Sequence, residues 1–292
     1  MEIYYFILYF FTYGFLGWCT EVAFAAVKQG KFVNRGFLNG PICPIYGVGV
    51  SVVVSFLAPL EGSLILLYAT STILVTFIEW LTGYLMDKIF HHKWWDYSSQ
   101  PLNIGGYVCL LFSLIWGVAC VAIVKVIHPL IYKALSFIPV TLGIVIAVIL
   151  AAVLFADLYV TASGILKLNK RLDAMEKIAA ELREVSDKVG ENIYESVMDT
   201  LEFQEEKKKM LAAASSEFKE KLEAASELRE RIGAATEEQK ARIEELKKKY
   251  PELAGRSTKV SVRLMKAFPK MESRNHRELL DAMKLRLKRD RK

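Results

Sequence analysis

The sequence predicts an all-α protein in which a polytopic membrane bundle of five spanning helices is followed by a cytoplasmic coiled-coil, helical region. Two observations lead to this prediction: 53% of the 292 residues are apolar, and the charges are unevenly distributed. Residues 1–164 carry seven basic and seven acidic side chains, whereas residues 165–254 have a net charge of −3 and residues 255–292 one of +9. An apolar part joined to a highly charged part excludes a single soluble globular domain.

Five apolar stretches in residues 1–164 are long enough to be membrane spans. They are residues 3–27, 42–60, 64–86, 104–127 and 138–162. Each has about 19–25 residues and few charges, and about 20 such residues cross a bilayer core of roughly 30 Å. The first stretch has no basic start and no small-residue cleavage site after it, so we expect a retained span rather than a signal peptide. Residues 1–164 are therefore predicted to form a transmembrane domain.

The distribution of lysine and arginine predicts how these spans are oriented, because cytoplasmic loops are enriched in both. Basic residues follow the first, third and fifth spans: Lys28, Lys31, Arg35, Lys88, Lys93, Lys167, Lys170 and Arg171. In the loop after the second span, Glu61 is the only charged residue, whereas Lys125 and Lys133 flank the fourth connection and favour the opposite orientation weakly. We therefore expect a multi-pass membrane protein with its N-terminus outside and its C-terminus in the cytoplasm.

Three acidic residues lie inside the expected spans, namely Glu21, Glu79 and Asp157 in spans 1, 3 and 5. An ionisable group at the centre of a span costs about 2.5–3.5 kcal/mol, so the presence of each of these acids calls for a structural or functional explanation. Each acid shares a helix face with glycine or threonine, and such small residues let membrane helices approach closely. One interpretation is a polar site for a cation, a proton or a polar substrate near the cytoplasmic ends of these spans. The other is a structural network in which Arg35 or loop amides satisfy the acids.

The two loops expected in the cytoplasm supply further candidate residues. The segment 34–47 holds three glycines and two prolines, so it cannot be regular helix throughout. A non-helical backbone within the membrane is tolerated where protein groups or water form hydrogen bonds with its amides and carbonyls. In the other loop, residues 94–98 place aromatic rings around Asp96. The predicted substrate-binding residues are Glu21, Arg35, Glu79, Asp157, Asn34, Asp96 and Asn103.

Several motifs occur in order along the first four spans. They are Gly17-Trp18, Glu21, Asn34-Arg35-Gly36, Gly40-Pro41, Pro44, Tyr46-Gly47, Glu79-Trp80, Trp95-Asp96-Tyr97-Ser98, Asn103, Trp116-Gly117 and His128-Pro129. Through these motifs, residues 1–164 resemble the ABC-transporter type IV, or CmpB-like, permease family. The resemblance implies a transporter component of about five helices in a bacterial plasma membrane. The chain has no G-x-x-x-x-G-K-[ST] motif, so ABC-type transport would need a separate ATPase subunit.

No motif in the sequence predicts an enzyme. The metalloprotease pattern H-E-x-x-H and the hydrolase pattern G-x-S-x-G are absent, and His91 and His92 are adjacent rather than spaced as metal ligands. The four cysteines, Cys19, Cys43, Cys109 and Cys120, lack the spacing of metal ligands. We therefore expect no catalytic residue, no cofactor and no metal site.

Residues 165–254 are predicted to form a cytoplasmic coiled coil. Apolar residues recur there at spacings of 4, 3, 4 and 3: Leu168, Leu172, Met175, Ala179 and Leu182. Gly190, Gly233 and Pro251 interrupt the pattern, so we expect two or three helices that form a homo-oligomer or fold back as a hairpin. The alternative is a solvated single helix. This region also suggests an alternative function, a non-transporting membrane scaffold that recruits partners through the coiled coil.

Residues 255–292 form a basic, amphipathic tail. Its apolar residues Val260, Leu264, Phe268 and Met271 alternate with lysine and arginine, as in helices that lie on anionic lipid. An acidic protein is the second candidate partner, and nucleic acid is less favoured because the tail has no recognition motif. Contact with the membrane requires the helices to turn back, and we expect the turns at Gly190 and Gly233.

Overall fold

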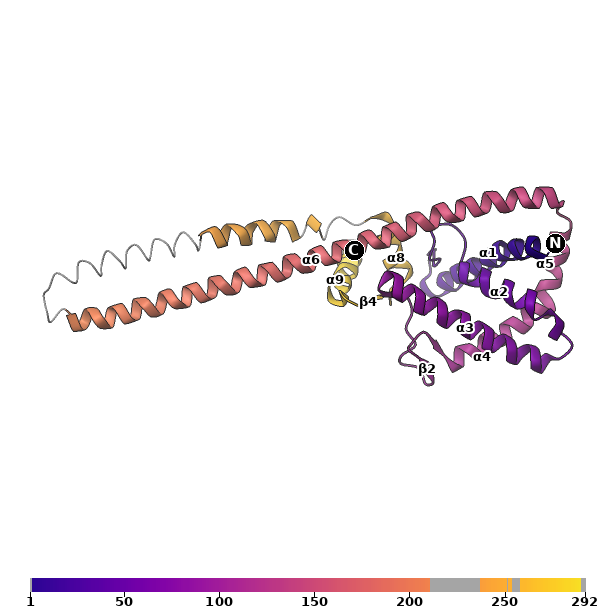
Figure 1. The fold of residues 1–292 in the computed structure, drawn as a ribbon, viewed down its shortest axis with the longest axis horizontal. Helices are drawn as coiled ribbons and strands as arrows, with labels where there is room; N and C mark the ends of the chain where they lie inside the picture. Colours follow the sequence, from indigo (N-terminus) through magenta and orange to yellow (C-terminus); the bar gives the residue numbers. More distant parts are fainter. Residues whose placement is uncertain (1, 211–236, 251, 254–257, 290–292) are drawn as a thin grey trace. The chain divides into compact units, whose positions relative to one another are not determined.

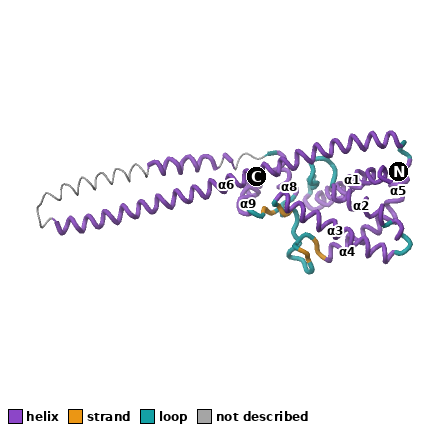
Figure 2. Tube along the Cα trace, in the orientation of Figure 1, coloured by secondary structure: helices purple, strands orange, loops and turns teal. Residues whose placement is uncertain are grey.

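The computed structural model describes residues 2–210, 237–250, 252–253 and 258–289. Most of these residues are helical (Figure 2). The chain divides into two compact units, one formed by Met1–Lys170 together with Ser257–Lys292 and the other by Arg171–Arg256. We call the first the membrane unit and the second the helical unit.

Figure 1 labels most of the elements, which follow one another along the chain. The first part contains α1 (Glu2–Gln29), α2 (Pro44–Phe56), η1 (Ala58–Leu60), α3 (Leu64–Phe90), β1 (His92–Lys93), β2 (Asn103–Ile104) and β3 (Val108–Cys109). The second part contains α4 (Leu110–Ala122), a π-helical turn η2 (Ile123–Ile127), α5 (His128–Ser136), α6 (Val140–Met210), α8 (Lys259–Ala267), β4 (Glu272–Ser273) and α9 (Arg277–Arg289). Residues 237–250 are also helical.

In the part of the chain that the structure describes, four helical stretches are long and apolar enough to cross a membrane: Ile3–Gln29, Leu64–Phe90, Leu110–Ser136 and Val140–Glu191. Large apolar side chains on them are exposed, for example Ile73 at 71% and Phe155 at 67%. Exposed apolar surface of this extent is typical of helices that face lipid. The predicted helical membrane bundle is confirmed, although the number of spans differs from five.

The second expected span, residues 42–60, contains the short helix α2. This helix has 13 residues, which is about 20 Å at roughly 1.5 Å per residue and too short for a bilayer core of about 30 Å. Pro44 lies in its first turn and Cys43 before it is extended. After Phe56 the chain turns through η1, which contains Pro59. The prolines and glycines around this apolar stretch therefore limit α2 to a short helix that packs against α1.

The fourth expected span, residues 104–127, begins later than predicted. Its first residues form the hairpin β2–β3, in which Asn103 pairs with Cys109. Gly105 and Gly106 make the turn at φ angles of +62° and +74°, which favour glycine. The helix starts only at Leu110 and continues through η2 into α5, as far as Ser136.

Glycine provides the close contacts within the membrane unit. A Cβ added at Gly14 would lie 2.8 Å from Ile42, and one at Gly47 would lie 2.6 Å from the Phe10 carbonyl oxygen. On α4, Gly117 likewise leaves room for Thr72 of α3. Side chains from α1, α2, α3, α4 and η2 together form a buried cluster, which consists of Tyr9, Tyr13, Val50, Val53, Val54, Leu67, Cys120 and Val124. Small residues therefore act as predicted for membrane helices.

Helix α6 is continuous through Gly190 and is described as far as Met210, so the expected turn at Gly190 is wrong. A glycine inside a helix costs about 1 kcal/mol relative to alanine, which a long helix tolerates. The other two expected interruptions, Gly233 and Pro251, lie outside the described residues. Within the helical unit, Arg242 bonds to Glu181, with 2.5 Å between Nη2 and Oε1. The helix of residues 237–250 therefore lies beside α6.

The basic tail, expected as a separate part over residues 255–292, belongs to the membrane unit. Strand β4 pairs antiparallel with β1, with Ser273 opposite His92. On α8, Val260 occupies the space that a side chain at Gly164 of α6 would need. The tail does return to the membrane unit, and its partners there are the protein's own loops and helices.

Candidate functional site

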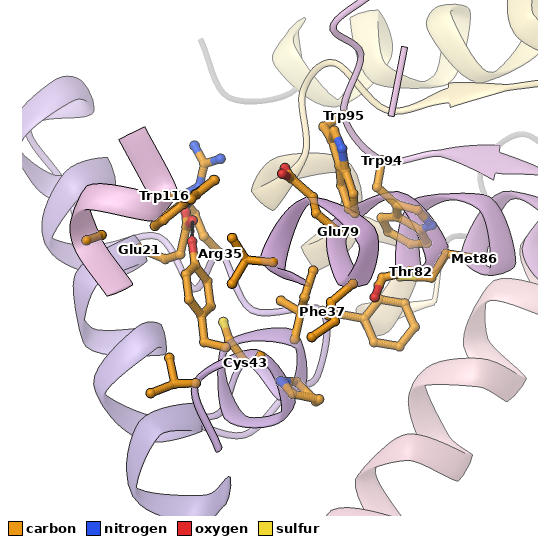
Figure 3. Close-up of a pocket in the computed structure, with 18 of the residues that line it drawn as sticks. Glu21, Arg35, Phe37, Cys43, Glu79, Thr82, Met86, Trp94, Trp95 and Trp116 are labelled. Carbon is orange, nitrogen blue, oxygen red and sulfur yellow. Dashed lines mark hydrogen bonds and ion pairs between the residues drawn. The ribbon is translucent and has the colours of Figure 1, made fainter. Parts of the chain in front are cut away.

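The membrane unit contains a cavity of about 350 Å³ between α1, α2, α3 and α4. Acidic and aromatic side chains are prominent in its walls (Figure 3). These are Glu21, Arg35, Phe37, Tyr46, Glu79, Trp94, Trp95, Tyr97, Trp116 and Phe268, and we call the site the aromatic cavity. Apolar residues, including Val50, Ile78 and Ile123, complete its lining.

At one side of the cavity, Glu21 is fully engaged by protein groups. Its Oε2 lies 3.0 Å from Nε of Arg35, and its Oε1 accepts a hydrogen bond of 2.7 Å from the Tyr46 hydroxyl. Gly17, one turn before Glu21, admits the Tyr46 ring, because a Cβ there would lie 2.5 Å from that side chain. The glycine thus explains how Tyr46 comes close enough to bind Glu21.

The second acid, Glu79 on α3, lacks such partners. The hydroxyl of Tyr97 lies 3.5 Å from Oε1, at the limit of a hydrogen bond. Its other oxygen, Oε2, is buried and has no hydrogen-bond partner among the described residues. No lysine or arginine of the described chain forms an ion pair with Glu79. Glu79 therefore places a carboxylate without a basic partner in the cavity.

The ring of Trp95 packs on the face of α3 that carries Glu79. Gly83 lies one turn after Glu79, and a Cβ added there would lie 3.2 Å from Trp95. The Trp95 Nε1 donates to the Tyr107 carbonyl oxygen at 2.8 Å, which fixes the orientation of the ring. Figure 3 shows Trp95 and Glu79 on the same side of the cavity.

Other rings complete the wall by edge-to-face packing. Trp94 has its ring centroid 5.2 Å from that of Phe37 and 5.2 Å from that of Phe268. Trp116 packs 5.7 Å from Tyr46. Edge-to-face pairs at these distances are favourable beyond the area that they bury. The rings support one another, so the wall is formed before any ligand enters.

Asp157, the third acid predicted for the site, lies away from the cavity. Its carboxylate accepts hydrogen bonds from the backbone amides of Asn39, at 3.1 Å, and Gly40, at 2.6 Å. The Asn39 side chain adds a third, at 2.7 Å. Asp157 therefore fixes the loop before α2, and the structure brings only two of the three predicted acids into the cavity.

The polar residues predicted for the loops also hold backbone in place. Asn34 accepts hydrogen bonds from the Trp18 indole, at 2.8 Å, and from the Gly36 amide, at 2.9 Å. Asn103 donates to the Gln100 carbonyl oxygen at 2.8 Å and accepts from the Gly106 amide at 3.1 Å. Neither lines the cavity.

Asp96 likewise bonds within its own loop, between Lys93 at 2.9 Å and the Ser98 hydroxyl at 2.6 Å. Partial burial would raise the pKa of its carboxyl group, but the hydrogen bonds from Ser98 and Lys93 outweigh this effect and lower the pKa to about 2. Asp96 is thus a charged anchor of the loop that carries Trp94, Trp95 and Tyr97.

Sequence analysis missed two arginine contacts that attach the tail to the loops and helices around the cavity. Arg274 bonds to Asp87 through Nε, at 2.7 Å, and Nη2, at 2.5 Å, and also donates to the Tyr107 hydroxyl at 3.0 Å. Arg263 donates to the carbonyl oxygens of Gly36, at 2.8 Å, and Phe37, at 2.7 Å. The partners lie 167 to 227 residues apart, so no local pattern could indicate them.

Among the described residues, no group of three or more His, Cys, Asp or Glu side chains is placed to hold a metal ion. The four cysteines are free thiols, three of them buried. The polar groups in the cavity lining include the carboxylates of Glu21 and Glu79, the Arg35 guanidinium, the Cys43 thiol and the hydroxyls of Tyr46 and Tyr97.

Comparison with known proteins gives one family. The family described as "Putative ABC-transporter type IV" matches residues 8–162, which include most of α1, all of α2 to α5 and the first part of α6. No curated protein and no solved structure matches the chain. The matched range contains every cavity residue except Phe268.

Proposed function

Because the chain belongs to the ABC-transporter type IV family, we propose that it is the membrane component of a transporter and that the aromatic cavity is its solute-binding site. The observation that carries this proposal is Glu79. A carboxylate without a basic partner is costly within a membrane bundle, and such residues mark solute and ion pathways. The cavity volume, about 350 Å³, falls in the range of small-molecule sites, roughly 300–1,000 Å³.

The predicted site residues then divide into two roles. Glu21, Arg35 and Glu79 line the cavity and contact the solute or set the charge around it. Asp157, Asn34, Asp96 and Asn103 position the loops from which the cavity rings project. In ABC-type transport a separate ATPase subunit would supply the energy, because this sequence has no phosphate-binding loop of its own.

We place this multi-pass protein in the bacterial plasma membrane, and the distribution of basic loops supports an N-terminus outside and a C-terminus in the cytoplasm. This orientation requires residues 34–56 to cross the bilayer together, as an irregular segment followed by α2. These residues run along α1: Arg35 contacts Glu21, the Cys43 amide donates to the Gly14 carbonyl oxygen at 2.9 Å, and Gly47 packs against Phe10. The loops that carry Arg35 and Trp95 then both face the cytoplasm. The ATPase would then meet the same side of the protein as the basic tail.

A second candidate function is a membrane scaffold that recruits partners through a cytoplasmic coiled coil. It is favoured by α6, which extends to Met210, well beyond the family match that ends at residue 162. Self-association of the helical unit into a homo-oligomer belongs to this proposal. Under it, the tail's exposed basic residues would bind anionic lipid or an acidic protein, with nucleic acid less favoured.

The accessibility of the cavity from each side of the membrane separates the two functions, because a transporter must open its site to both sides in turn. In a variant whose four cysteines are replaced by alanine, Thr82→Cys places one thiol in the cavity wall. We expect a membrane-impermeant maleimide to label it in both inside-out and right-side-out native vesicles that contain ATP. Ile73→Cys, on the exposed face of α3, is the matched control and should not react.

Labelling of Thr82→Cys from one side alone, with and without ATP, would contradict the transporter. Labelling from neither side would contradict it as well, and both results would favour the scaffold. The same membranes also show whether an ATPase subunit copurifies with the wild-type chain.

A further inference from the structure

The charges in the aromatic cavity do not balance. Arg35 is the basic residue of its lining, and it is already paired with Glu21 at 3.0 Å. The guanidinium of Arg35 also lies over the Phe24 ring, 5.8 Å from its centroid. Glu79 has no such partner among the described residues, so its ionised form adds one unpaired negative charge to the cavity. A ligand that neutralises this charge must itself be a cation.

The walls indicate what kind of cation fits. Three tryptophans, Trp94, Trp95 and Trp116, line the cavity. A cation within about 6 Å of an indole face is attracted to it, and tryptophan attracts cations more strongly than the other aromatic residues do. Trp95 packs on the face of α3 that carries Glu79, so one ligand group can contact both. The remaining lining is mostly apolar, which suits a ligand with a hydrocarbon body.

We propose that the aromatic cavity binds an organic monocation, an amine or quaternary ammonium with an apolar body, whose charged end lies between Glu79 and Trp95. The assignment of this cation as the transported solute rests on the proposed function, whereas its binding does not.

The same observations disfavour other ligands. Calcium prefers six to eight oxygen ligands at about 2.3–2.6 Å, and the cavity offers too few oxygens beside Glu79. An anion would find Arg35 already neutralised and would be repelled by Glu79. A neutral apolar molecule would leave the Glu79 carboxylate buried beside it without a partner.

The test compares two probes of nearly the same shape and opposite charge, benzyltrimethylammonium and phenylmethanesulfonate. Binding to the full chain in lipid nanodiscs is measured by calorimetry. We expect the ammonium to bind at least about tenfold more tightly than the sulfonate, because charge attraction is strong in a partly buried site. Equal affinity of the two probes, or no binding of the ammonium at millimolar concentration, would overturn the proposal without the need for any variant.

Two variants locate the binding site. Glu79→Gln keeps the size of the side chain and removes its charge, and we expect it to weaken ammonium binding by about tenfold or more. Glu61→Gln is the matched control, because Glu61 lies outside the cavity, and it should bind the ammonium as the wild type does. Wild-type affinity in a folded Glu79→Gln protein would contradict the proposed position of the charge. If that variant does not fold, Trp95→Leu replaces it, with the same loss expected.

The outcome is separable from that of the labelling experiment. If Thr82→Cys is labelled from both sides but the ammonium does not bind, the proposed cation is wrong and the proposed transporter function still stands. Ammonium binding with access from one side only would support a cation-binding site and overturn transport.

Discussion

In the membrane unit, several charged side chains join segments far apart in the sequence, whereas in the helical unit most of the described ion pairs join neighbours on one helix. Asp87 and Arg274 are 187 residues apart, and the Asp87 side chain is only 2% exposed. In the helical unit, Lys188 pairs with Glu184 four residues away, and both side chains are more than half exposed. The Arg242–Glu181 pair is the described exception there.

The difference shows which charges determine the structure. An exposed pair competes with water and contributes little, whereas a buried charge that loses its partner is strongly destabilising. The charges of the membrane unit therefore hold particular loops and the tail in place around the cavity. Those of the helical unit lie exposed along the helix surfaces. Mutations in the two units should differ accordingly.

The largest effect is expected from Arg274→Ala, which leaves Asp87 buried without a basic partner. Loss of one partner of such a pair costs about 2–5 kcal/mol. Thermal unfolding in detergent should show the loss of stability, and limited proteolysis should show release of residues 258–289. Arg277→Ala is the control, because Arg277 is 68% exposed and pairs with Glu272 on the surface.

A further substitution tests whether the buried charge causes this loss. In the Arg274→Ala background, Asp87→Asn removes the charge and should restore part of the stability. If Arg274→Ala and Arg277→Ala unfold at the same temperature, the tail is not held by Asp87 and the comparison between the units fails.

The next largest effect is expected from Asp157→Asn. The carboxylate accepts hydrogen bonds from the amides of Asn39 and Gly40, and bonds to a charged group are worth about 1.5–3 kcal/mol. We expect a loss of that order, together with faster hydrogen exchange in residues 34–43. Tyr159→Phe, an exposed position on the same helix, should change neither measurement. Unchanged exchange in that loop would show that Asp157 does not fix it.

A smaller, pH-dependent effect is expected at His92, which is 1% exposed. Burial lowers the pKa of His92 below its usual value. The hydrogen bond to the His91 carbonyl oxygen raises the pKa, but the nearby His91, His276 and Lys284 lower it, so the net shift is downward. Below about pH 6.5 the unfolded chain therefore binds a proton that the folded chain does not. The stability from neutral His92 is complete above that pH and decreases as the pH falls.

Melting temperatures of the wild type and His92→Gln at pH 7.5 and 5.5 measure this effect. The wild type should lose more stability on acidification than the variant does. Equal losses would mean that His92 does not contribute to the pH dependence.

The smallest effect is expected in the helical unit. Lys188→Ala removes an exposed pair with Glu184, and we expect no measurable change in melting temperature. A change as large as that of Arg274→Ala would contradict the distinction between the two units.

The sequence predicted those features that depend on local pattern. Long apolar stretches indicated the helices that can cross a membrane, because length and hydropathy suffice for that. The acid at Glu21 and the glycine at Gly17 were visible by their spacing, and their contacts with Arg35 and Tyr46 involve a nearby loop and helix. The short α2 was harder to foresee, since its apolar residues continue past the point where Leu57 and η1 end the helix.

Features that depend on distant contacts were not predictable. Asp87 lies just after the expected third span, and nothing near it in the sequence indicates Arg274 as its partner. The three acids in the spans looked alike, yet Arg35 engages Glu21, loop amides engage Asp157 and neither engages Glu79. Which acid stays without a basic partner is decided by tertiary packing.

The central claim is that Glu79 and Trp95 form a site for an organic cation, and a crystal structure of the full chain with 4-bromobenzyltrimethylammonium tests it most directly. The account predicts anomalous bromine density inside the aromatic cavity, with the ammonium nitrogen beside the Glu79 carboxylate and within about 6 Å of the Trp95 ring. An empty cavity, or a probe whose ammonium group points away from Glu79, would contradict it.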